Sequence, residues 1–213
     1  MLRLATKYEA QALRAAAIRT LTTAYPSTSA GWHQRDTFRL FPPIENEIPT
    51  LLALSLEHDV SSVVPTLLFA ACRAQNPGEV ISEFLASPLS LDVIQDACRR
   101  FVEGRDRLRQ AEIKYILAFL DRSFLRPYCQ NYNSDAARIQ MYVPHTLLRL
   151  ATSSPYEDWC IDTDLHVSSL GLCGNCEQAI KKSIREGEAR IWRELPQIFG
   201  YSSWEILQTK AAL

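Results

Sequence analysis

Apolar residues at helical spacing are the feature that most restricts the fold of this chain. Near its start, Leu4, Tyr8, Leu13, Ala17 and Leu21 recur at steps of four or five residues, which is the spacing of one face of an α-helix. Only seven of the 213 residues are glycine, and the many alanine and leucine residues favour helices over strands. The sequence therefore predicts an all-α fold, an irregular helical bundle.

The same spacing continues along the chain and predicts where the helices lie. Trp32 falls in a loop that is rich in proline and serine, where we expect it to pin the loop by burying against the helices. Asn46 is expected to cap a helix, Gly104 to bend one, and Pro196 to end one. The expected helices cover roughly residues 2–23, 46–57, 61–72, 90–120, 136–150 and 175–195, with a short closing helix around Trp204.

Composition and charge argue against several classes of partner. The chain has 23 Lys and Arg against 24 Asp and Glu, a net charge of −1, so no global attraction to nucleic acid or to an anionic membrane is expected. No apolar run approaches the roughly 20 residues that span a bilayer. Arg3, Lys7 and Glu9 interrupt the apolar stretch that a secretory signal requires. We therefore expect a cytoplasmic or nuclear protein that is not secreted, with its six cysteines as thiols or metal ligands.

The strongest chemical motif is Cys173-Gly-Asn-Cys176, directly before an expected helix. A C-x-x-C turn places two sulfurs where they can share a tetrahedral ion, and a structural zinc site needs two more ligands. Cys129 and Cys160, both in expected loops, complete a candidate set of Cys129, Cys160, Cys173 and Cys176. His166 is an equally acceptable replacement for one of them. Structural zinc and simple reduced thiols are both open interpretations of this motif.

Catalytic signatures are missing from the sequence. No G-x-S-x-G, H-E-x-x-H or phosphate-binding glycine loop occurs. A helix N-terminus would lower the pKa of Cys173, but no βαβ pattern surrounds it, which argues against a thioredoxin-like site. Cys160 with His166 leaves a thiol-dependent enzyme as a weaker alternative. Cys72 and Cys98 lie on apolar helical faces and are expected to be core residues.

Both ends of the chain contain short sequence motifs that resemble those of a known family. The C-terminal segment contains L-C-x-x-C, then G-x-x-R-x-W, L-P, F-G and S-W-E-x-L, in that order between residues 172 and 207. Its aromatic and leucine residues can form an apolar cluster around Pro196. Residues 7–13 read K-Y-E-A-Q-A-L. Taken together, the chain resembles the later part of fungal, basidiomycete-type BTB/POZ domain-containing proteins.

The resemblance implies a non-enzymatic protein–protein interaction scaffold with an unidentified protein partner. Residues 1–25 would be the closing helices of a BTB/POZ domain, two helices rather than one, and residues 26–213 a helical C-terminal region. Most of the BTB fold and its dimerisation surface would be missing, as in a truncated chain. We also expect the first helical face, Leu4, Tyr8, Leu13 and Leu21, to bury against residues 48–72.

The resemblance also bears on the metal. Relatives often carry a further cysteine pair upstream of the C-x-x-C. Cys129 stands where that pair would begin, but the position six residues on is Asp135, a departure from a four-cysteine site. A structural zinc-binding helical domain with cysteine ligands is therefore the alternative to the scaffold function, and the thiol-dependent enzyme is the second alternative.

Overall fold

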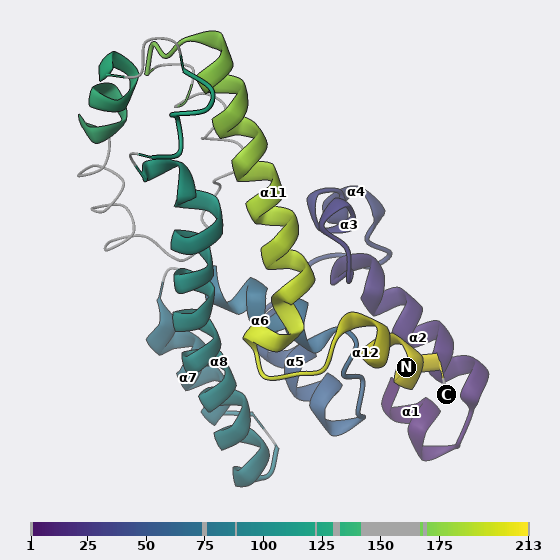
Figure 1. Cartoon of the computed structure of the whole chain (residues 1–213). Coiled ribbons are helices and arrows are strands. Elements are labelled where there is room, and N and C mark those ends of the chain that lie inside the picture. Colours follow the sequence, from purple (N-terminus) through teal and green to yellow (C-terminus); the bar gives the residue numbers. More distant parts are fainter. Residues whose placement is uncertain are drawn as a thin grey trace. The chain divides into compact units, whose positions relative to one another are not determined.

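The computed structural model describes residues 2–73, 76–87, 89–121, 123–129, 133–141, 167 and 170–212, and in these residues it contains helices and turns but no strand (Figure 1). The expected all-α fold, an irregular helical bundle, is confirmed. Residues 133–141 are also helical. The other elements are α1 (Leu2–Lys7), α2 (Gln11–Ala24), α3 (Ser29–His33), α4 (Arg35–Phe38), α5 (Glu47–Glu57), α6 (Val64–Cys72), α7 (Pro77–Leu85), α8 (Leu91–Ala111), the π-helix η1 (Glu112–Ile116), the 3-10 helix η2 (Leu117–Leu120), α11 (Gly174–Ile198) and α12 (Trp204–Ala212).

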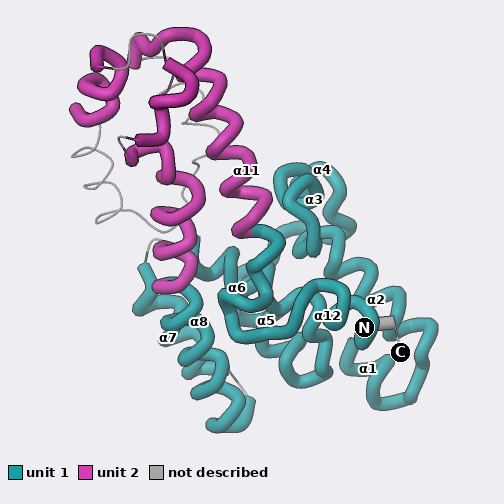
Figure 2. Tube along the Cα trace, in the orientation of Figure 1, with its two compact units in different colours: residues 1–105, 192–213 teal, residues 106–191 magenta. Residues whose placement is uncertain are grey.

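The chain forms two compact units, coloured separately in Figure 2. Unit 1 combines Met1–Arg105 with Trp192–Leu213, and unit 2 is Asp106–Ile191. Residues 1–25 pack within unit 1 through contacts such as the ion pair from Arg3 to Glu57, 3.1 Å long. The expected boundary at residue 25 stays a prediction.

The helix expected over residues 2–23 is two helices, as the family resemblance implies and the apolar spacing alone does not. Glu9 adopts a left-handed backbone conformation with φ of 51°, and the backbone N–H of Ala10 returns to the carbonyl of Ala5. A left-handed residue cannot continue a right-handed helix, so α1 ends at Lys7 and α2 begins at Gln11.

The break changes which side chains face the core, and the burial predicted for this segment is largely wrong. Leu4 and Tyr8 are 56% and 69% exposed. Leu13 is also exposed, and Leu21 alone of the four is buried. The helical phase resets at the break, so Leu4 and Tyr8 do not share a face with Leu21. The buried positions of α1 and α2 are Leu2, Ala5, Ala17, Ile18, Leu21 and Ala24.

The core of unit 1 includes an aromatic cluster. Trp32 is buried, as predicted, with its ring centroid 5.1 Å from that of Phe69 and 5.8 Å from that of Trp192. Phe69 comes from α6, which is buried along almost its whole length. The indole N–H of Trp192 donates to the carbonyl of Ser27 at 2.8 Å. Trp32 lies in the short helix α3 rather than in the expected loop. The segment that contains Ser27 and α3 is therefore attached to the C-terminal part of unit 1.

Two local predictions in unit 1 are corrected, at Asn46 and at Pro196, and the surroundings of Gly104 become visible. The side chain of Asn46 makes no capping bond; Glu47 instead accepts the backbone N–H of Ile44 at 3.1 Å. Helix α8 runs through Gly104 to Ala111, and the absence of a side chain at Gly104 gives room to the ring of Phe199. The expected bend at Gly104 stays a prediction. Helix α11 runs through Pro196 to Ile198 rather than ending before it.

Candidate metal centre

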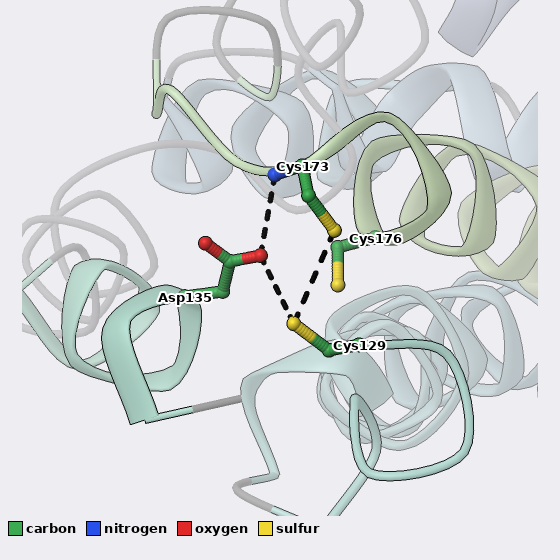
Figure 3. A group of neighbouring side chains, drawn as sticks. All are labelled: Cys129, Asp135, Cys173 and Cys176. Carbon is green, nitrogen blue, oxygen red and sulfur yellow. Dashed lines mark hydrogen bonds between the residues drawn. The ribbon is translucent and has the colours of Figure 1, made fainter. Parts of the chain in front are cut away.

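Four side chains of unit 2 converge on one point (Figure 3). They are Cys129, Asp135, Cys173 and Cys176, and their ligand atoms all lie within 4.8 Å of one another. They come from three separate segments: a turn, the helical stretch 133–141 and the start of α11. The side chains that these three segments bring together are cysteine and aspartate, which commonly bind metal ions.

Cys129 is positioned by the turn that precedes it. Residues 123–128 form consecutive turns, and the backbone N–H groups of Tyr128 and Cys129 both donate to the carbonyl of Leu125 at 3.0 Å. The side chain of Leu125 is buried in the core. The buried leucine thus anchors the turn that carries the cysteine.

Asp135 lies in the first turn of the helical stretch 133–141. Ala136 and Ile139 from the same stretch are buried, so this helix packs within unit 2 through these two side chains. Asp135 itself is only 3% exposed. A buried carboxylate requires hydrogen-bond or charge partners, since burial alone penalises its ionised form.

Cys173 and Cys176 flank the first residues of α11. Gly171 has a φ of +63°, which suits glycine in the turn just before the motif. The backbone N–H of Glu177 donates to the carbonyl of Cys173 at 3.0 Å and begins the helix. Cys176 is fully buried.

One sulfur–sulfur distance in the cluster matches that of a tetrahedral zinc site. The sulfurs of Cys129 and Cys173 are 3.9 Å apart, whereas two sulfurs bonded to one tetrahedral zinc at about 2.3 Å lie roughly 3.8 Å apart. Oδ2 of Asp135 accepts from the Cys129 thiol at 3.1 Å and from the Cys173 backbone N–H at 3.2 Å. Figure 3 shows all four side chains directed toward one another.

The pKa values of the carboxylate and of the buried thiol shift in opposite directions. Burial acts to raise the pKa of Asp135, but hydrogen bonds from Cys129 and from the backbone of Cys173 outweigh it and lower that pKa overall. Burial raises the pKa of the Cys176 thiol, and its contacts with Cys129, Cys173 and Asp135 raise it further. A cation is the natural partner for such a group, because it displaces thiol protons and neutralises the resulting charge.

Three of the four ligands predicted from sequence are brought together: Cys129, Cys173 and Cys176. Cys160, the fourth, and His166, its alternative, lie outside the described residues. Asp135 is absent from the ligand set predicted from the sequence, in which it stands only as the residue six positions after Cys129. That spacing, together with the ability of carboxylates to bind zinc, was the available signal.

The other two described cysteines lie away from this cluster. Cys72 is fully buried at the end of α6, and burial strongly raises the pKa of its thiol. Cys98, on α8, is partly exposed. The expectation of a core residue is therefore confirmed for Cys72, while Cys98 lies at the edge of the core.

Comparisons with known proteins identify no relative. No protein-family description, no curated protein and no solved structure matches the chain. Within the described residues, every helix is either too short or too polar to cross a lipid bilayer. The cluster of Cys129, Asp135, Cys173 and Cys176 is the candidate site that the described residues offer.

Proposed function

We propose that this chain is a non-enzymatic helical protein in which a structural zinc ion holds unit 2 together. The observation that carries the proposal is the convergence of Cys129, Asp135, Cys173 and Cys176 within 4.8 Å. An ion bound there would join three segments that are distant in sequence. Such an ion contributes stability because it binds the assembled site and not the unfolded chain, so that the free energy of metal binding adds to that of folding.

The chemistry of the donors favours zinc in a structural role. Three thiolates select zinc over magnesium or calcium, which prefer oxygen ligands. Four protein ligands close a tetrahedral site, whereas catalytic zinc sites keep one position for water or substrate. The site therefore supports stabilisation rather than chemistry. Zinc–thiolate binding also agrees with a proposed location in the cytoplasm or nucleus, where thiols stay reduced.

Metal analysis of the full chain, purified without added zinc, tests the proposal. We expect about one equivalent of zinc in the wild type and a large loss in Cys173→Ser, because structural zinc requires all four ligands. Cys98→Ser is the matched control, since it removes a cysteine outside the cluster and should keep its zinc. Wild-type protein without metal, or equal zinc in both variants, would refute the proposal.

We propose protein–protein interaction, of the kind found in BTB/POZ domain-containing scaffolds, as a second function. The supporting observation is a set of large apolar side chains in unit 1 that face solvent, which include Phe38 at 59% and Leu40 at 71% exposure. Ile44 belongs to the same set and is 44% exposed. Contiguous exposed apolar patches commonly mark contact sites for other proteins, and these three residues belong to one short stretch of the chain, residues 38–44. The partner would be another protein rather than a nucleic acid or a membrane.

A further inference from the structure

Two of the three cysteines in the candidate metal centre are open to solvent, and the third is not. Cys129 and Cys173 are partly exposed, whereas Cys176 is fully buried. Residues next to the exposed pair face solvent as well: Tyr128 is 48% exposed, and Gly174 is also exposed. A small molecule dissolved in water therefore reaches Cys129 and Cys173 more readily than Cys176.

The two exposed thiols also lie next to each other. Their sulfurs are 3.9 Å apart and are joined by a dashed line in Figure 3, whereas the sulfurs of a disulfide lie about 2.0 Å apart. A disulfide between them thus needs an approach of roughly 2 Å. Cys129 ends a turn and Cys173 lies just before α11. Each side chain can therefore move toward the other without a break in a helix.

The cysteines outside the cluster lack this combination of exposure and proximity. Cys72 is fully buried, and Cys98 is partly exposed but is not a member of the cluster. A thiolate that a peroxide oxidises becomes a sulfenic acid, which forms a disulfide when a second thiol is near. Of the cysteines in the described residues, Cys129 and Cys173 are the pair that meets both conditions.

We propose that the metal centre is a redox switch, in which a peroxide converts Cys129 and Cys173 to a disulfide and the zinc ion is released. This inference rests on the proposed zinc site and adds its regulation. In that site both sulfurs would be bound as thiolates, because a coordinating thiol is deprotonated. The thiolate is also the form of cysteine that peroxides oxidise.

The reaction has two steps, and hydrogen peroxide is its oxidant. One thiolate attacks the peroxide, so that an S–O bond forms, the O–O bond breaks and hydroxide leaves. The other thiolate attacks the resulting sulfenic acid, so that the S–S bond forms, the S–O bond breaks and a second hydroxide leaves. The two sulfurs lose two electrons in total, and the two peroxide oxygens gain them. Protons from water neutralise both hydroxides.

Oxidation would remove the zinc because it removes two of its four ligands. The thiolate is the metal ligand, so a disulfide leaves only Cys176 and Asp135, whereas structural zinc uses four ligands. The new bond would join two of the segments that the ion had joined, the turn that carries Cys129 and the start of α11. These segments would stay connected after the ion leaves. Reduction of the disulfide would restore the site.

Treatment of the zinc-loaded full chain with hydrogen peroxide tests this proposal. A chromogenic chelator measures the released zinc, and mass spectrometry of non-reduced peptides, after alkylation of the remaining thiols, identifies the disulfide. We expect about one zinc ion to be released for each disulfide formed. The disulfide should join Cys129 to Cys173 within one chain, and Cys176 should be alkylated. Dithiothreitol followed by added zinc should restore the bound metal.

Matched variants assign the disulfide to this pair. Cys98→Ser removes a cysteine outside the cluster and should give the same disulfide and the same zinc release as the wild type. Cys176→Ser removes the buried ligand but keeps the exposed pair, so the Cys129–Cys173 disulfide should still form. Circular dichroism identifies a variant that does not fold, and the disulfide of the wild type then decides alone.

The outcomes separate this inference from the proposed zinc site. A chain purified without zinc would refute the zinc site and, with it, the switch. Zinc that stays bound after oxidation, or that leaves without a disulfide, would overturn the switch and leave the zinc site standing. A wild-type disulfide that contains Cys176 or any other cysteine in place of Cys129 or Cys173 would overturn it as well.

Discussion

Asp135 makes hydrogen bonds within the cluster, and the proposed zinc site gives it a second role as a ligand. Its Oδ2 accepts hydrogen bonds from the Cys129 thiol and from the Cys173 backbone N–H, so it orders both neighbours. The same oxygen lies within 4.8 Å of all three sulfurs, where it can bind an ion. If Asp135 serves only as a hydrogen-bond acceptor, its replacement must also accept hydrogen bonds. If it binds zinc, any residue that is a good zinc ligand can replace it.

Substitution of Asp135 distinguishes the two roles. Asp135→Cys should keep about one equivalent of zinc, because a fourth thiolate completes a common structural site. Asp135→Ala removes the ligand and should lower zinc affinity at least tenfold, as measured by competition with a chromogenic chelator. Wild-type affinity in Asp135→Ala would show that the carboxylate is not a ligand. Loss of zinc in Asp135→Cys with normal helicity would show that hydrogen bonding to the backbone is its main role.

The sequence predicted part of this site for a clear physical reason. Cys173 and Cys176 are joined by a short turn, so their proximity follows from local geometry. The addition of Cys129 depended on residue type alone, since thiols outside a secreted protein are candidate ligands. Asp135 could not be selected in this way, because most of the 24 acidic residues are expected on the surface. Its burial emerges only when residues 133–141 pack as a helix.

The C-terminal end of α11 shows how an element tolerates an internal proline. Pro196 has no N–H, so it cannot donate to the carbonyl of Trp192 four residues earlier. The indole N–H of Trp204 donates to that carbonyl instead, at 2.9 Å, in a buried position. The backbone N–H of Tyr201 in turn donates to the carbonyl of Pro196 at 2.8 Å. The helix therefore continues to Ile198 because the following segment replaces the missing donor.

A double-mutant cycle tests this replacement. Trp204→Phe should lower the free energy of unfolding by about 1–3 kcal/mol beyond the loss of packing, because it leaves the buried Trp192 carbonyl without that donor. The cost should be smaller in a Pro196→Ala background, where the backbone N–H at residue 196 can bond the same carbonyl. Chemical denaturation of the four proteins measures both values. Equal costs in the two backgrounds would show that the indole bond does not replace the helical one.

Helices were predicted well where the spacing of their apolar residues was uninterrupted. Helices α5 and α6 agree with expectation, as does the burial of Trp192, Leu195, Phe199, Trp204 and Leu207. The apolar spacing alone wrongly predicted one helix over residues 2–23, because Glu9 resets the helical phase. A non-glycine residue with positive φ has no clear sequence signal. Gly104 was interpreted from propensity, while its actual role depends on Phe199, a residue distant in sequence.

At the scale of the whole molecule, unit 1 is assembled from both ends of the chain. Trp192 bonds the carbonyl of Ser27, and the side-chain amide of Gln208 donates to the hydroxyl of Ser27 at 2.7 Å. Periodicity within one segment contains no information on such pairings. The aromatic residues on each side were predicted to be buried, but their shared cluster became visible only in three dimensions.

The exposed apolar residues of unit 1 make the proposed interaction function testable. Leu40→Glu combined with Ile44→Glu should abolish binding to a protein partner, because charges at these positions oppose burial in an interface. Met141→Glu, at a residue of unit 2 that is 75% exposed, is the matched control. Quantitative affinity capture identifies proteins that bind the wild type and the control but not the double variant. Each such protein is then purified, and its affinity for all three chains is measured. A captured set that is the same for the double variant and the wild type would contradict an interaction through this surface.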